Sequence, residues 1–99
     1  MPENSLRVVA RMVAKPERVD EVRSILTGLV APTRSERGCV TYELLQNRSD
    51  PTDFTFVEEW EGDAALEAHL STEHVRDALS RLQGLLAREP DISTYSVVK

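Results

Sequence analysis

Two strand-like segments joined by a short polar loop constrain the fold of this chain most strongly. Residues 39–46 (CVTYELLQ) and 53–60 (DFTFVEEW) are rich in β-branched and aromatic side chains, which favour extended structure. The six residues between them (NRSDPT) include asparagine, aspartate and proline, which are typical of turns. The pattern therefore predicts an antiparallel β-hairpin over residues 39–60.

A strand and a helix are predicted before the hairpin. Residues 6–14 (LRVVARMVA) are rich in valine and indicate a strand. Residues 15–17 (KPE) favour a helix start, because proline is tolerated in the first turn and an acid follows it. Apolar residues then recur at three- and four-residue steps, at Val19, Val22, Leu26, Leu29 and Val30. We expect Pro32 to end or kink this helix.

Two short helices and a last strand are predicted after the hairpin. The Gly-Asp pair at residues 62–63 offers a break and an N-cap, which predicts a helix over residues 64–70. Ser-Thr at residues 71–72 can cap a further helix. The apolar stripe of that helix is Val75, Leu79, Leu82 and Leu86. Glu-Pro at residues 89–90 is expected to end it, and residues 92–98 (ISTYSVV) to form a strand.

The predicted order is β-α-β-β-α-β with the second helix broken, which is an α+β pattern of the ferredoxin-like type. It implies a four-stranded antiparallel sheet with helices on one face, in one domain over residues 1–99. The first strand is apolar on both of its faces, with Val8, Ala10 and Met12 on one and Val9 and Val13 on the other. An apolar face without helices needs a partner, most simply a second copy related by two-fold symmetry. We therefore predict a homodimer.

Charge and composition exclude several classes of partner. The net charge of −5 and the scattered arginines disfavour nucleic acid and anionic membrane surfaces, which attract clustered positive charge. No segment approaches the roughly 20 apolar residues that span a bilayer. The first five residues carry no export signal, and the single cysteine, Cys39, fits a reducing compartment. We expect a cytoplasmic protein whose partner is a small molecule.

The only tryptophan and both histidines lie within fifteen residues, which makes this stretch the candidate site. His69 shares a helical face with Leu66, so its imidazole should point at the sheet, where it could accept a proton from a phenolic O–H. The alternative is a core histidine bonded to a strand carbonyl or to Glu59. Trp60 could stack on an aromatic substrate with its N–H free to donate, or it could be core. His74 is expected to be exposed.

Other candidates follow from position along the predicted strands. Phe54 and Phe56 share the face of Trp60 and could line an apolar pocket or fill the core. Two tyrosines on strands could offer a phenol to a ligand, namely Tyr42 and Tyr95. Glu58 and Glu59 occupy opposite faces of one strand. One of these carboxylates is expected to pair with Arg7 or Arg11, and a general-base role is the alternative.

No metal or cofactor is predicted from these motifs. The two histidines are five residues apart, which is off the four-residue helical step, and no third ligand is evident nearby in the sequence. No glycine-rich phosphate loop, nucleophile elbow or CxxC motif is present.

Several stretches resemble the antibiotic-biosynthesis monooxygenase family, and most closely its small quinol-monooxygenase-like members. They are residues 14–17 (AKPE), residues 38–44 (GCVTYEL), Glu59-Trp60, residues 65–70 (ALEAHL) and His74. The resemblance implies ferredoxin-like protomers that pair sheet to sheet into a dimeric α+β barrel, with a pocket between each sheet and its own helices. It also implies oxidation of phenols, anthrones or quinols by O₂, often without metal or flavin.

Two departures from relatives narrow the expected chemistry. A pocket asparagine of cofactor-free polyketide oxygenases is replaced here by Phe56, and haem-degrading relatives differ at the positions of Val9, His69 and Leu79. Haem degradation is therefore not expected. We predict cofactor-independent oxidation of a small phenolic, quinol or anthrone-like compound. In this prediction His69 is the proton acceptor or an orienting group, and Trp60, Phe54 and Phe56 wall the pocket. The alternatives are a cofactor-free isomerase of a small metabolite or signal and a non-catalytic small-molecule-binding dimer.

Overall fold

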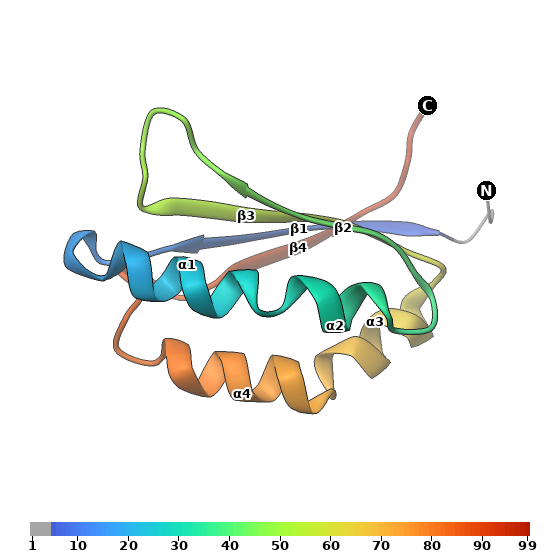
Figure 1. Cartoon of the computed structure of the whole chain (residues 1–99). Helices are drawn as coiled ribbons and strands as arrows, with labels where there is room; N and C mark the ends of the chain where they lie inside the picture. The colour runs from blue at the N-terminus through green and yellow to red at the C-terminus, as the bar shows by residue number, and fades with distance from the viewer. Residues whose placement is uncertain (1–4) are drawn as a thin grey trace.

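The computed structural model describes residues 5–99. The prediction that the first five residues carry no export signal therefore falls mostly outside the described residues. Within this range an antiparallel sheet of four strands is covered on one face by helices (Figure 1), which confirms the predicted α+β, ferredoxin-like fold. The strands are β1 (Leu6–Val13), β2 (Cys39–Gln46), β3 (Asp53–Trp60) and β4 (Asp91–Tyr95). Their spatial order is β2-β3-β1-β4. The predicted hairpin is β2 and β3, with the bounds expected from the sequence.

The helices follow the predicted order with different ends. They are the 3₁₀ turn η1 (Pro16–Arg18), α1 (Val19–Thr27), α2 (Val30–Arg34), α3 (Asp63–Leu70) and α4 (Glu73–Leu82). Gly62 is the N-cap residue of α3, and Asp63 is its first helical residue. Thr72 caps α4 as predicted, because its hydroxyl accepts from the Val75 N–H at 3.4 Å. No helix of the described residues has the length and apolar character to cross a bilayer.

Two predicted helix ends were wrong. Pro32 lies inside α2, in the first turn, where its missing N–H has no intrahelical acceptor to lose, and the helix breaks instead between Thr27 and Val30. The last helix ends at Leu82 rather than at residues 89–90, since Gly84 turns the chain at a φ of +82°. Leu86 therefore leaves the helical stripe and forms a bridge with Ala14.

The core lies between the helices and one face of the sheet. Val8, Ala10 and Met12 of β1 lie opposite Glu58, Phe56 and Phe54 of β3, so these six side chains share the helix-covered face. Helix side chains buried against this face include Val22 and Leu26 of α1 and Val75, Ala78 and Leu82 of α4. Full burial of a valine or leucine side chain contributes about 1.5–3 kcal/mol.

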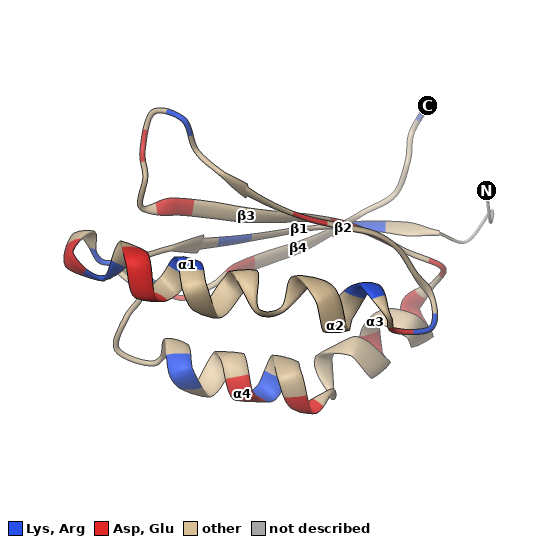
Figure 2. Cartoon of the chain, in the orientation of Figure 1, with Lys and Arg blue, Asp and Glu red and all other residues tan. Residues whose placement is uncertain are grey.

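The other face of the sheet, the open face, carries no helix within residues 5–99 (Figure 1), and charged residues occur along the strands that form it (Figure 2). Arg7 lies opposite Glu59 on this face, and their side chains form an ion pair at 3.4 Å, which confirms the predicted pairing across the sheet. Exposed apolar side chains on the same face include Leu45, Val57 and Tyr95. The face is thus less apolar than the sequence pattern of β1 alone indicated.

Candidate active site

A cavity lies between the covered face of the sheet and helices α3 and α4. Its volume is about 50 Å³, which is room for a few water molecules and less than a benzene-sized ligand occupies. Most of its wall is aliphatic, and three polar side chains reach it: Tyr42, Glu58 and His69. Exposed Leu70, Leu79 and Ile92 also line it, so they mark its opening to solvent.

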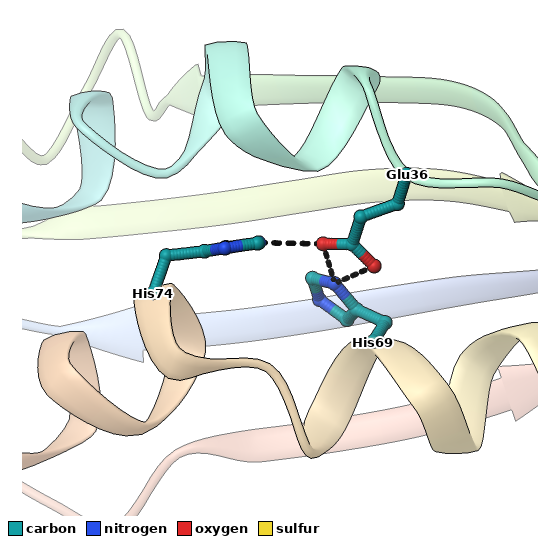
Figure 3. Close-up of side chains that lie close together, drawn as sticks. All are labelled: Glu36, His69 and His74. Carbon is teal, nitrogen blue, oxygen red and sulfur yellow. Dashed lines mark hydrogen bonds and ion pairs between the residues drawn. The ribbon is translucent and has the colours of Figure 1, made fainter.

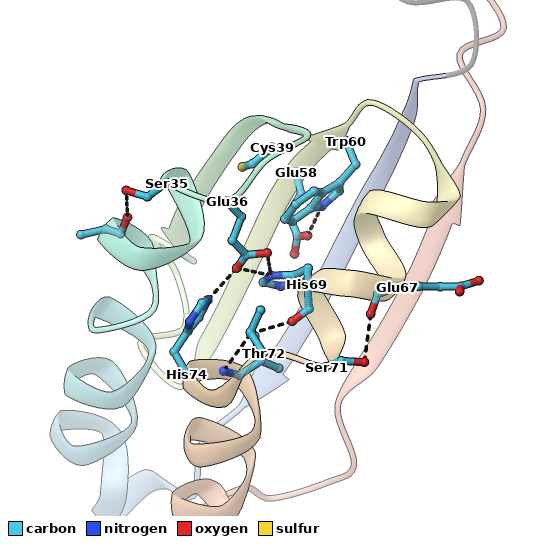
Figure 4. Close-up of polar contacts among 12 residues, drawn as sticks. Ser35, Glu36, Cys39, Glu58, Trp60, Glu67, His69, Ser71, Thr72 and His74 are labelled. Atoms are coloured by element: carbon cyan, nitrogen blue, oxygen red, sulfur yellow. Dashed lines mark hydrogen bonds and ion pairs between the residues drawn. The ribbon is translucent and has the colours of Figure 1, made fainter.

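Glu58 is a buried carboxylate on this wall. The register of β3 places it between Val8 of β1 and Tyr42 of β2, and the side chain is only 4 % exposed. Its Oε1 accepts a hydrogen bond of 2.7 Å from the Trp60 indole N–H (Figure 4). Burial raises the pKa of Glu58 from 4.5 to about 7, although the indole N–H opposes this shift. Glu58 can therefore release or take up a proton near neutral pH.

Tyr42 contributes a phenol that stays protonated. Its ring stacks on Phe56 with centroids 4.8 Å apart, and it is buried beside Glu58. Burial, reinforced by the negative charge of Glu58, holds the pKa of Tyr42 well above its ordinary value. Within the cavity this side chain can donate a hydrogen bond but does not act as a base near neutral pH.

His69 sits at the end of α3 with its ring against aromatic side chains. Its centroid lies 4.6 Å from that of Trp60 and 5.7 Å from that of Tyr42. Its Nδ1 faces both oxygens of Glu36, at 2.9 and 3.1 Å (Figure 3). A carboxylate only accepts hydrogen bonds, so Nδ1 carries a hydrogen and a neutral ring has its lone pair on Nε2. His69 also lines the cavity, and the hydrogen bonds found within residues 5–99 include none to its Nε2.

His74 contacts the same carboxylate from the first turn of α4. Its Nε2 lies 2.6 Å from Glu36 Oε2, and its side chain is half-buried, which corrects the expectation that it is exposed. The Thr72 hydroxyl donates to the His69 carbonyl at 2.7 Å and so ties the end of α3 to the start of α4. Glu36, His69 and His74 each bring one metal-ligating atom to within 4.8 Å of the others. We call these three residues the carboxylate–histidine cluster.

Glu36 is the residue that sequence reasoning missed, and it supplies the third group that was not evident beside the two histidines. It lies in the loop between α2 and β2, far from them in sequence. The hairpin register contains the missing signal: Cys39 pairs with Trp60, so the residues before β2 must lie beside the helix that follows β3.

Gly38 holds this loop against α3. Its φ is +89°, and a Cβ atom there would lie 2.5 Å from the Cβ of Ala65. Only glycine meets both demands. The Gly38 carbonyl also accepts from the Glu61 N–H at 2.9 Å, which fixes the loop to the start of the α3 segment and brings Glu36 to His69.

The structure brings only part of the predicted site to the cavity. Four predicted residues line it: His69, Phe56, Leu66 and Tyr42. Trp60 and Phe54 are buried in the core and lie outside the lining, and the Trp60 N–H is not free, because it bonds Glu58. Tyr95 pairs with Arg7 on the open face, so its parity points it away from the cavity.

The chain belongs to the antibiotic biosynthesis monooxygenase family, whose sequence model matches residues 5–81. The solved structure of PA3566 from Pseudomonas aeruginosa is similar over 100% of this chain and 99% of that one, with 33% identity and a TM-score of 0.93. A Bacillus subtilis (strain 168) protein, "Putative monooxygenase YcnE", is 29% identical over 83 residues, which cover 84% of this chain and 87% of that protein.

A longer relative is the protein sll1783 of Synechocystis sp., which is 26% identical over 97 residues, or 98% of this chain. The match spans 66% of that relative's length. Two relatives, YcnE and the protein Rv0793 of Mycobacterium tuberculosis, are named putative monooxygenases, and the family model carries the description antibiotic biosynthesis monooxygenase.

Proposed function

We propose that this protein is a cofactor-independent monooxygenase that oxidises a small phenolic, quinol or anthrone-like compound with O₂. The observation that carries the proposal is His69, which lines a mostly apolar cavity while Glu36 holds its Nδ1–H. A neutral imidazole held in this way presents a basic Nε2 to the cavity, which suits removal of a proton from a phenol or an activated C–H. Glu36 is then a positioning residue, because it acts through His69.

The proposed reaction uses the substrate as the reductant. For an anthrone-like CH₂ group, His69 Nε2 takes one proton and the carbanion passes an electron to O₂. The two radicals combine into a C–O–O bond. Cleavage of the O–O bond leaves one oxygen as the new carbonyl and releases the other as water, which carries away both hydrogens of the CH₂. A water-poor cavity favours this sequence because charge is poorly screened there.

Two further groups support the substrate in this proposal. The Tyr42 hydroxyl donates to a developing phenolate or enolate oxygen, since its pKa lies well above neutrality. Glu58, with a pKa of about 7, exchanges protons with the leaving oxygen. An aromatic substrate needs more room than the cavity has, so we propose that Leu70 and Leu79 at its opening move aside when it binds.

The protein is further proposed to work as a cytoplasmic homodimer that pairs through the open face. Support comes from the apolar side chains that this face exposes to solvent, namely Leu45, Val57 and Tyr95. A second copy related by two-fold symmetry would cover these side chains and remove their apolar surface from water.

Oxygen consumption tests the proposed function. Chelator-treated protein is mixed with a panel of reduced quinones and anthrones in an oxygen electrode. We expect uptake above autoxidation with wild-type protein and with Glu67→Gln, an exposed change on α3, but not with His69→Gln. Rates equal to autoxidation across the panel would contradict the oxygenase.

A cofactor-free isomerase is the second candidate, and the small cavity favours it. Two groups that can exchange protons, His69 and Glu58, line a volume of about 50 Å³. That arrangement suits removal of a proton at one carbon of a small metabolite and its return at another. It predicts incorporation of solvent deuterium into a substrate without oxygen uptake.

A further inference from the structure

We propose that Glu36, His69 and His74 form a binding site for a divalent cation of the zinc type. The three side chains come from the α2–β2 loop, the end of α3 and the start of α4, and they point at one another (Figure 3). Two imidazole nitrogens and one carboxylate make a donor set that zinc accepts with a fourth position left open. Nitrogen donors also disfavour Mg²⁺ and Ca²⁺, which prefer oxygen.

The geometry of the cluster is close to that of a metal site. His69 Nδ1 lies 2.9 Å and His74 Nε2 2.6 Å from the same Glu36 oxygen, and the three ligand atoms lie within 4.8 Å of one another. Zinc holds such ligands at about 2.0–2.2 Å, so neighbouring donors in a tetrahedral site stand about 3.3–3.5 Å apart. Side-chain shifts of less than about 1 Å would admit the ion, and no element of the fold has to move.

The charge balance of the cluster also favours a cation. Within residues 5–99, the only ion-pair partners of Glu36 are the two histidines, which are neutral unless protonated. Glu58 adds a second carboxylate near this region, and the charge of Glu36 helps to raise its pKa. A divalent ion would neutralise Glu36 while keeping both rings as neutral ligands.

A path to the site exists from the surface. His74 lies in a groove between α1 and α4, where Ser24, Gly28, Asp77 and Arg81 also line the wall. The His74 side chain is 27% exposed and that of Glu36 is 13% exposed, whereas His69 is buried behind them. An ion can therefore reach His74 and Glu36 from the groove without passing through the cavity.

Cation binding would change what His69 presents to the cavity. In the hydrogen-bonded cluster, Nδ1 carries the hydrogen and Nε2 is an acceptor. A cation bound at Nδ1 needs the lone pair of that nitrogen, so Nδ1 can no longer carry the hydrogen. In a neutral ring the hydrogen is then on Nε2, which becomes a hydrogen-bond donor. This consequence rests on the proposed function: a His69 that donates no longer removes a substrate proton, and zinc is expected to inhibit the oxidation.

The binding test uses the full chain after chelator treatment, with Co²⁺ as a spectroscopic probe and Zn²⁺ as competitor. We expect one ion per chain, the visible absorption of a low-coordinate Co²⁺ site, and bleaching by Zn²⁺. Glu36→Gln and His74→Gln should each weaken binding by about tenfold or more. His74 is half-buried, so its variant keeps the test valid should a change at buried His69 unfold the chain. Glu73→Gln, an exposed neighbour on α4, is the matched control and should bind like the wild type.

Unchanged Co²⁺ binding in Glu36→Gln and His74→Gln, or no binding by the wild type, would overturn the proposal. The result is independent of the oxygenase, because binding is read from the spectrum and not from turnover. Inhibition by Zn²⁺ that is lost in His74→Gln would support the link to His69. A bound ion that leaves oxidation unchanged would keep the cation site and contradict the role of His69 as the proton acceptor.

Discussion

Glu58 and Glu59 are neighbours on β3, yet the two faces of the sheet give them different surroundings. Both are buried, at 4% and 5% exposed. Glu59 lies on the open face and has the guanidinium of Arg7 at 3.4 Å. Glu58 lies on the helix-covered face, where its hydrogen-bond partner is the neutral indole of Trp60, and burial raises its pKa to about 7. A buried carboxylate with a cation supports structure, whereas one without a cation exchanges protons.

The contrast extends to the rest of each face. The covered face carries the cavity, with Tyr42 and His69 on its wall, and the carboxylate–histidine cluster lies behind it. The open face carries an ion pair and exposed apolar side chains such as Val57. Alternate residues of the same strands form the two faces. Neighbouring residues of one strand therefore belong to the proposed active site and to the proposed dimer interface.

The largest expected effect is on catalysis at the covered face. His69→Gln should lower kcat/KM by about 10²–10⁴-fold on a proven substrate, because it removes the proposed proton acceptor. Tyr95→Phe, on the open face, should leave kcat/KM within about twofold, the scatter of a surface change. Both follow from initial rates of oxygen uptake. Similar losses in the two variants would break the assignment of chemistry to one face.

Truncating a side chain should also destabilise the protein more on the covered face than on the open face. Phe56→Ala removes a ring that is 1% exposed and should lower the free energy of unfolding by about 3–5 kcal/mol. Val57 is the next residue of the strand, lies on the open face and is 36% exposed. Val57→Ala should lower the free energy of unfolding by about 1 kcal/mol or less. Urea denaturation of both variants measures the difference, and equal losses would contradict it.

The pH dependence of stability should report Glu58. Its pKa is raised on folding, so the folded chain holds this proton more tightly than the unfolded chain. The stability from Glu58 is then present below about pH 4.5 and is lost as the pH rises to about 7. The difference between these two pKa values corresponds to about 3 kcal/mol in the free energy of unfolding.

Glu58→Gln should remove this pH dependence of stability. Its free energy of unfolding, compared with that of the wild type, should be most favourable above pH 7. Trp60→Phe removes the N–H that opposes the shift, so it should raise the pKa of Glu58 further. Urea midpoints between pH 4 and 8, with carbon NMR titration of the carboxyl group, measure both effects. A Glu58 that titrates near 4.5 in the folded protein would refute the covered-face half of the comparison.

The smallest expected effect concerns the open face. Arg7→Met removes the cation beside Glu59 and should lower the free energy of unfolding by about 1 kcal/mol, since the arginine is partly exposed. The same change should weaken the proposed dimer, which sedimentation can measure. A dimer of unchanged affinity would place the interface elsewhere.

Local patterns predicted the elements of this fold well. The hairpin strands have the bounds that their β-branched and aromatic composition predicted, and a Ser-Thr pair marked the α4 cap. The end of α4 was missed because Gly84 outweighs an apolar stripe that runs on to Leu86. Tyr95 was predicted to lie in the site but lies on the open face. Its face depends on the register of β4 against β1, which no local pattern encodes.

The candidate site was predicted in part for the same reason. His69 and its apolar neighbours share one helix, so their common face follows from helical spacing. Glu36 reaches His69 through a tertiary contact across 33 residues, and Gly38 makes that contact close enough. The pairing of Cys39 with Trp60 brings the two regions together, so the site could be assembled only once the sheet register was known.

We propose that His69, on the covered face, begins an oxygenation that needs no cofactor. The most direct measurement is turnover of an anthrone under ¹⁸O₂ by chelator-treated wild-type protein and by His69→Gln. We expect one ¹⁸O atom in each quinone formed by the wild type, at a rate well above autoxidation, and loss of that excess rate in the variant. Wild-type product without the label, or equal rates in the two proteins, would contradict it.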